Sequence, residues 1–154
     1  MKRHPGLTIA TMLIGCLCAT PSAAREFDSC SGERILAAAP RLMPCPDKPN
    51  CVSTEAIDPD RKIAPITVNG DLTSIRERLL AAIALQSGSR IAIASEGFIV
   101  ATFRSRLFGF IDEAQFLIEP NEHRVRLRSG ACSGYFDFGV NRRRIEAIED
   151  KLAR

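Results

Sequence analysis

The chain has 154 residues, which suits one domain and is too short for two ordinary ones. It is 45% hydrophobic and 25% charged, which is typical of a globular protein and excludes a disordered chain, a collagen or a coiled coil. The formal net charge is only +3, so the composition does not indicate a nucleic-acid-binding protein. Six cysteines are common in exported proteins and less so in cytosolic ones.

The first 24 residues have the pattern of a secretory signal peptide. Lys2 and Arg3 precede residues 7–19, an uncharged and mostly apolar run. As a helix that run would span about 20 Å, which is short of the roughly 30 Å core of a bilayer. We therefore expect an exported protein of the periplasm or cell envelope, not a membrane-spanning one.

Two processing sites compete within this leader. Residues 22–24 (Ser-Ala-Ala) suit an ordinary signal peptidase that cuts before Arg25. Residues 13–16 (Leu-Ile-Gly-Cys) resemble a bacterial lipobox, in which Cys16 would be acylated and would anchor a lipoprotein. Removal of residues 1–24 takes away two cations and no acid, so the net charge falls from +3 to +1.

Residues 25–64 predict an irregular, disulfide-tied arm. Six prolines lie between Pro40 and Pro65, and three cysteines lie in the same region. Because proline fixes φ and lacks an N–H donor, we expect a fixed loop on a core, with a short helical segment at residues 35–39.

Residues 65–154 predict an α+β domain. A strand at 66–68 is followed by a helix at 74–86, with Ser74 and Glu77 as a capping box and Gly88 at its end. A tight hairpin (91–94 and 98–104) and two further strands (114–119 and 124–129) come next. The last helix, 141–153, has Asn141 as its predicted N-cap.

This order, β-α-β-β-β-β-α, predicts an antiparallel sheet because consecutive strands are joined by short turns. Each helix has one apolar stripe to bury. Both helices are therefore expected to pack on the same face of the sheet.

Four cysteines remain after the leader: Cys30, Cys45, Cys51 and Cys132. Disulfide bonds are expected in an oxidising compartment. A four-thiolate zinc site is the alternative, but the C-x5-C spacing departs from the usual one. A redox-active thiol is a third possibility, and no metal or other cofactor is expected.

Candidate catalytic residues are few. His123, the sole histidine after the leader, follows a Pro-Asn-Glu turn signal, where a solvated side chain is expected. Asp112 and Glu113 could form a paired acid, but neighbours on a strand point to opposite faces. We therefore name no catalytic residue.

The arginine pattern is more informative. Arg124, Arg126 and Arg128 alternate with apolar residues, which places all three on one face of a strand. If the helices cover the other face, this one is open and can bind an anion. The alternative is a solvated face with an internal salt bridge. Residues 142–144, three arginines in the first turn of the last helix, oppose its dipole, and Asp137 is their expected partner.

Several motifs together resemble a known family. They are C-P-x-x-P-N-C-V-S at 45–53, D-E-A-Q-F at 112–116, R-S at 128–129 and G-Y-F-D-F-G-V-N-R-R-R at 134–144. The chain from about residue 42 to 152 resembles the family of unknown function numbered 1499. That family occurs in bacterial exported proteins, lipoproteins and plastid proteins and has no established activity, so the resemblance implies a domain and not a reaction.

One stretch departs from the family pattern. After the Arg-Ser pair the family continues Ala-Ser-Arg-Val-Gly-Tyr, whereas residues 130–135 are Gly-Ala-Cys-Ser-Gly-Tyr. Cys132 and Cys30 are both additional to the pattern. The resemblance therefore implies the bridges Cys45–Cys51 and Cys30–Cys132, worth about 2.4 and 4.7 kcal/mol by the chain-entropy estimate.

The resulting hypothesis is a non-catalytic envelope module that binds an anionic small molecule, a lipid headgroup or a partner protein. It involves no nucleic acid, and it meets the membrane only through the lipid anchor of the lipoprotein alternative. The candidate binding residues are Arg126, Arg128, Ser129, Tyr135, Asp137 and Asn141. Two alternatives are a structural or interaction scaffold without a ligand and a hydrolase that uses Arg128, Asp137 and Asn141.

Overall fold

The computed structural model describes Cys30 and residues 40–153. The predicted leader, Cys16 and the short helical segment at 35–39 lie outside the described residues. The elements follow the order β1 (Cys51–Ser53), β2 (Ile66–Thr67), α2 (Leu72–Ala84), β3 (Ser89–Ala94), β4 (Phe98–Arg104), β5 (Ile111–Glu119), β6 (Arg124–Ala131) and α3 (Val140–Leu152). A 3-10 turn, η1 (Pro120–Glu122), joins β5 to β6.

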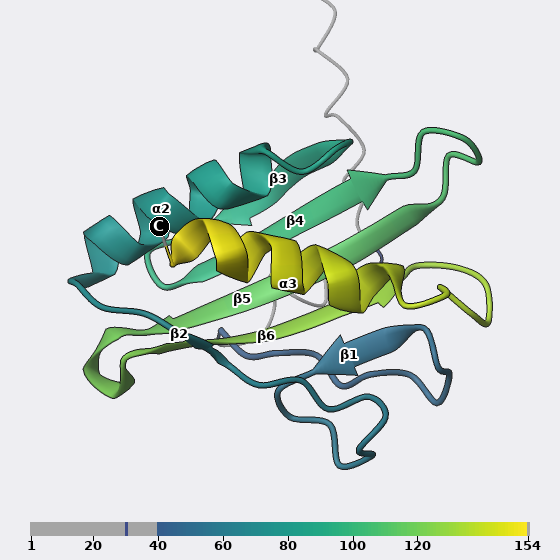
Figure 1. Cartoon of the computed structure of the whole chain (residues 1–154), viewed down its shortest axis with the longest axis horizontal. Coiled ribbons are helices and arrows are strands. Elements are labelled where there is room, and N and C mark those ends of the chain that lie inside the picture. Colours follow the sequence, from purple (N-terminus) through teal and green to yellow (C-terminus); the bar gives the residue numbers. More distant parts are fainter. Residues whose placement is uncertain (1–29, 31–39, 154) are drawn as a thin grey trace, which may run out of the picture.

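The sheet has the order β1-β6-β5-β4-β3. The short strand β2 also pairs with β6, as β1 does. Every ladder between these strands is antiparallel. Both helices lie on one face of the sheet (Figure 1). The predicted α+β class and the packing of both helices on one face are confirmed.

The main core lies between the helices and this face. Ile75, Leu79 and Ile83 of α2 and Ile145 and Ile148 of α3 are completely buried against the sheet. The sheet contributes the alternate residues of β4, β5 and β6, which its period of two directs to the same side. The apolar stripes predicted for both helices are thus confirmed.

The capping of α2 differs from the prediction. Asp71, not Ser74, is the N-cap, and its carboxylate accepts the Ser74 N–H at 2.9 Å. An aspartate three residues earlier satisfies the first free N–H groups of the helix, so the predicted capping box at Ser74 and Glu77 is wrong. The helix also ends earlier than predicted, with Leu85 as its C-cap.

The start of α3 also differs. Gly139 is the N-cap, and Asn141 lies inside the first turn with its side chain fully buried. Asp137 takes over the capping role, since its carboxylate accepts the backbone N–H groups of Gly139 and Asn141 at 3.0 and 2.9 Å. The predicted N-cap was therefore wrong by two residues.

The described part of the arm packs on the second face of the sheet, against β4 and β5. Leu42 is buried against Phe98 and Val100, and the backbone N–H of Met43 donates to the side chain of Gln115 at 2.8 Å. Farther along, β1 adds a strand beside β6, an element that the sequence did not predict because three residues are too few to show a period. The arm thus forms part of the sheet and of a second, smaller core.

Two disulfide bonds hold this arrangement. Cys45–Cys51 closes the proline-rich loop before β1, as expected, and Cys30–Cys132 joins residues 102 positions apart. The second bond fixes Cys30 at the loop between β6 and α3.

We expect Gly88→Ala to destabilise the fold by about 2–4 kcal/mol. Gly88 has a φ of +68°, and an added Cβ would lie 2.2 Å from the carbonyl oxygen of Arg104. Gly134→Ala is the matched control, because Gly134 has a φ of +85° but no atom near the added Cβ, so it should cost only about 1 kcal/mol. Urea unfolding of both variants measures the difference, and equal losses would show that the close contact costs nothing.

Candidate functional site

Three of the predicted site residues form a buried polar network at the start of α3. The Asn141 side chain accepts a hydrogen bond from Ser129 Oγ at 2.6 Å, and its amide donates to Asp137 at 3.0 Å. Asp137 also accepts two backbone N–H groups, so both of its oxygens are engaged. The network joins β6, the β6–α3 loop and α3.

Arg144 extends this network toward β5. It donates to Asn141 Oδ1 at 2.8 Å and to Asp112 Oδ2 at 2.6 Å, and its guanidinium lies 4.4 Å from the centre of the Phe103 ring. Cation–π contact and ion pairing together keep this half-buried cation in place.

The partner predicted for the three arginines of α3 was wrong. Arg142 donates to the carbonyl oxygens of Asp60 and Lys62, Arg143 to that of Phe138, and Arg144 to Asn141 and Asp112. Asp137 instead accepts the backbone N–H groups of Gly139 and Asn141 and the side-chain amide of Asn141.

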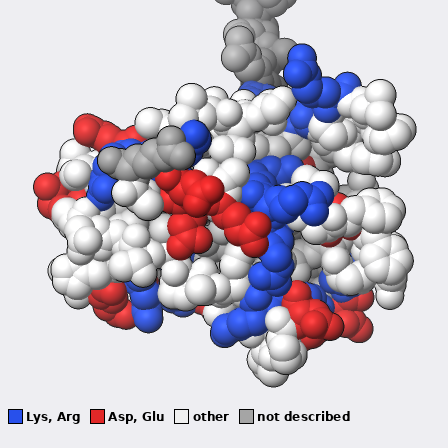
Figure 2. Space-filling view, in the orientation of Figure 1, with Lys and Arg blue, Asp and Glu red and all other residues white. Residues whose placement is uncertain are grey.

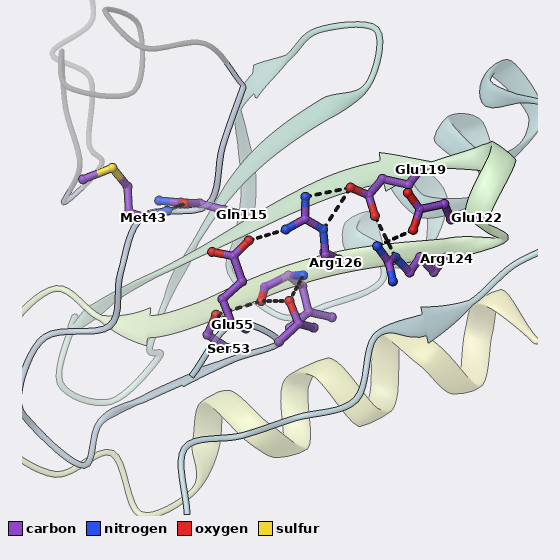
Figure 3. Close-up of polar contacts among 10 residues, drawn as sticks. Met43, Ser53, Glu55, Gln115, Glu119, Glu122, Arg124 and Arg126 are labelled. Carbon is purple, nitrogen blue, oxygen red and sulfur yellow. Dashed lines mark hydrogen bonds and ion pairs between the residues drawn. The ribbon is translucent and has the colours of Figure 1, made fainter. Parts of the chain in front are cut away.

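Arg124 and Arg126 lie on the opposite face of the sheet, within a network of carboxylates (Figure 3). Arg126 pairs with Glu119 at 2.7 Å and with Glu55, and Arg124 pairs with Glu119 at 2.7 Å and with Glu122. Hydrogen bonding to Glu119 raises the pKa of Arg126, and the same bond holds the pKa of Glu119 below its ordinary value. These two cations are therefore balanced by fixed acids.

Arg128 is different because its side chain is buried. It is 7% exposed, and its Nη1 lies 3.5 Å from Glu113, which is completely buried. Its Nε and Nη1 have no hydrogen-bond partner among the described residues. Burial lowers the pKa of Arg128, and the nearby Glu113 opposes that shift.

The expectation of an open arginine face is wrong for Arg128, whereas the side chains of Arg124 and Arg126 are 38% and 29% exposed. Leu42 and Met43 of the arm pack on the neighbouring strands, and Gln115 and Arg128 are buried on that face. The sequence did not show the arm lying there, since nothing local in residues 40–50 specifies which face it covers.

The six predicted site residues do not share one pocket. Ser129, Asp137 and Asn141 lie on the helix side, whereas Arg126 and Arg128 lie on the arm side of the same sheet. Tyr135 is exposed and lines a pocket of about 370 Å³ with residues of the disulfide loop and of the 58–61 loop. Four aspartates and three cations line that pocket, so it shows no net preference for an anion: Asp47, Asp58, Asp60, Asp137, Lys48, Arg61 and Arg142.

The structure brings together a set of residues that the sequence analysis did not consider. Phe108 and Phe110 of the β4–β5 loop and Phe136 and Phe138 of the β6–α3 loop line one pocket of about 330 Å³. Phe108 is 71% and Phe138 is 87% exposed, which is unusual for large apolar side chains. We call these four residues the aromatic cluster.

The backbone is strained at one residue of the aromatic cluster. Phe138 has a φ of +53°, in the left-handed region that a bulky residue rarely adopts. The Arg143 guanidinium donates to the Phe138 carbonyl at 3.0 Å and steadies this conformation. Strain of this kind often marks a functional site.

A signal for the cluster was present in the sequence. The chain has eight Phe, and four of them occur as two Phe-x-Phe pairs next to glycines, in segments too rich in turn residues to be strands. Aromatic side chains in a turn cannot all be buried, and that could have marked them as a surface.

The described residues do not support a metal site or a membrane-spanning helix. There, no group of three or more His, Cys, Asp or Glu could hold a metal ion, and no helix is long and apolar enough to cross a membrane. Asp112 and Glu113 point to opposite faces, as predicted, since one pairs with Arg144 and the other lies beside Arg128. His123 lies exposed at the end of the turn before β6.

The fold and the site define a small α+β domain with a disulfide-bonded arm, a buried polar network and an aromatic end. The chain belongs to a family of unknown function, since the family model described as Protein of unknown function (DUF1499) matches residues 41–152. The family membership predicted from the sequence motifs is confirmed. No curated protein and no solved structure matches the chain.

We expect Asn141→Ala to lower the free energy of unfolding by about 3 kcal/mol, because it leaves the buried Ser129 hydroxyl without its acceptor and removes one bond each from Asp137 and Arg144. Asn121→Ala, at an exposed turn position, is the control and should change stability by less than about 0.5 kcal/mol. Thermal and urea unfolding measure both. A neutral Asn141→Ala would contradict the structural role of the network.

We expect Glu119→Gln to lower stability at pH 7 by roughly 1 kcal/mol, the size expected for a partly exposed ion-pair network. The pKa of Glu119 is lower in the folded chain than its ordinary value of 4.5, so its contribution is present above pH 4.5 and disappears as the pH falls through the folded pKa. The stability difference between the variant and the natural chain should therefore vanish at acid pH. A difference that persists unchanged below pH 3 would contradict this assignment.

Proposed function

We propose that this chain is an exported, non-catalytic binding module of the cell envelope, and that the aromatic cluster is its binding surface. The single observation that carries the proposal is the exposure of four phenylalanines around one pocket. Exposed apolar patches of this kind mark interaction sites, because their exposure to water is unfavourable unless a partner covers them.

Export is supported by the leader pattern and by two disulfide bonds, which persist in oxidising compartments. Processing at Ala24 and acylation at Cys16 both remain compatible with this proposal.

The ligand that suits the cluster is an apolar group, such as an acyl chain or an aromatic ring. Phenylalanine rings offer no hydrogen-bonding groups, and the two carboxylates that line the pocket, Asp112 and Asp137, already accept hydrogen bonds within the protein. The anionic ligand proposed for Arg126 and Arg128 has weaker support, because acids balance Arg126 and Arg128 is buried beside Glu113.

The second candidate is an interaction scaffold without a small ligand. It is favoured by the network of Ser129, Asp137 and Asn141, whose polar groups bond to one another and to the backbone. The hydrolase alternative has less support, since Arg128 lies on the other face of the sheet from Asp137 and Asn141.

The test is the binding of a neutral apolar fluorophore, N-phenyl-1-naphthylamine, to the full disulfide-bonded chain. We expect saturable binding that falls at least tenfold in Phe136→Ser/Phe138→Ser, because the variant removes half of the rings around the pocket. Ile57→Ser/Leu85→Ser is the matched control, since both residues are exposed but lie outside the pocket. Equal binding by all three proteins, or none by any, would reject the aromatic cluster as the binding surface.

A further inference from the structure

Three cations lie near the aromatic cluster, and one of them, Lys48, also lines the neighbouring pocket that contains four aspartates. Lys48 donates to the Gly134 carbonyl and Arg143 to the Phe138 carbonyl, while Arg106 is exposed in the β4–β5 loop, two positions before Phe108 in the sequence. No carboxylate of the described residues forms an ion pair with these three cations. A backbone carbonyl does not neutralise the positive charge of a side chain. The end of the molecule that carries the aromatic cluster therefore combines exposed apolar rings with cations.

The arginines of β6 show the opposite arrangement. Arg124 and Arg126 each contact two carboxylates, and Arg128 lies beside Glu113. Cations without a described ion pair therefore lie at the end of the molecule formed by the β4–β5 and β6–α3 loops, as Arg76 does at the opposite end of β4. Figure 2 shows largely uncharged surface at the right-hand side, with Lys and Arg and also Asp and Glu side chains around it.

The length of chain between the lipidation candidate Cys16 and the aromatic cluster is also relevant to its partner. The Cys30–Cys132 bond fixes Cys30 at the β6–α3 loop, beside Ser133 and Gly134 of the aromatic pocket. Cys16, the lipidation candidate, precedes Cys30 by 14 residues, which span at most about 50 Å when extended. An acyl anchor there would hold the aromatic end within reach of the bilayer.

We propose that the aromatic cluster docks on the surface of an anionic lipid bilayer, with the phenylalanines entering the headgroup region and Lys48, Arg106 and Arg143 facing the lipid phosphates. The proposal rests on the proposed function, because it names the partner of the same surface. Interfacial binding by apolar side chains flanked by cations gains from apolar burial and from attraction to anionic lipids. A neutral protein groove would satisfy the rings but not the unbalanced cations.

The absence of tryptophan from the chain gives a clean reporter. Phe138→Trp is made in the full disulfide-bonded chain that also carries Cys16→Ser, so that no acyl anchor contributes. With vesicles of equal parts phosphatidylcholine and phosphatidylglycerol we expect a blue shift and stronger emission, with little change on vesicles of phosphatidylcholine alone. Ile57→Trp, at a fully exposed position outside the cluster, is the control and should not shift.

The contribution of positive charge to vesicle binding is tested with substitutions of two arginines. Arg143→Gln should lower the partition coefficient on the anionic vesicles about fivefold. Arg76→Gln should leave it unchanged, because Arg76 likewise donates only to carbonyl oxygens (those of Ala94 and Ser95) but lies at the opposite end of β4. Added salt should weaken binding by the natural chain.

The outcomes separate the two proposals. Cluster-dependent binding of the fluorophore without a Phe138→Trp shift on either vesicle would overturn the membrane proposal and assign the cluster to a protein or soluble apolar partner. A shift of equal size in Ile57→Trp would also overturn it, since binding would then be unspecific. Loss of both the vesicle and the fluorophore signals would reject the proposed function itself.

Discussion

The side chain of Asn141 is the interaction on which the loop end of this domain depends. It is buried at the start of α3 and bonds to Ser129 of β6, to Asp137 of the preceding loop and to Arg144 of the next helical turn. Because a buried amide must satisfy its polar atoms, these partners have to be in place together. The network therefore fixes the helix, the sheet and the loop between them in one arrangement.

This rigidity has a consequence at the surface. With Asp137 held inward on both oxygens, its neighbours Phe136 and Phe138 are directed outward, and Phe138 adopts a left-handed backbone conformation. The same short segment thus satisfies the polar core and exposes two rings. The polar residues of the family motif serve the fold, and the aromatic residues between them form the surface.

Charge compensation distinguishes the two regions rich in arginine. On the arm side, glutamates from three segments balance Arg124 and Arg126 (Figure 3), and Arg128 is buried beside Glu113. At the aromatic end, cations bond to carbonyl oxygens and keep their charge. A count of arginines along the chain cannot separate these cases, because the acids that balance β6 come from residues 55, 119 and 122.

The sequence by itself determined the α+β class, the two apolar helix stripes, the order of helices and strands after residue 65 and the family, since each of these is expressed in local periodicity or in contiguous motifs. The residues that cap the helices were harder to predict from the sequence, because several polar residues compete for the same N–H groups. Only the folded backbone selects Asp71 and Asp137. The placement of the arm, the burial of Arg128 and the meeting of two phenylalanine pairs were decided by the tertiary structure alone. These features join residues far apart in the chain, and their energies depend on burial and neighbouring charge, which no local pattern records.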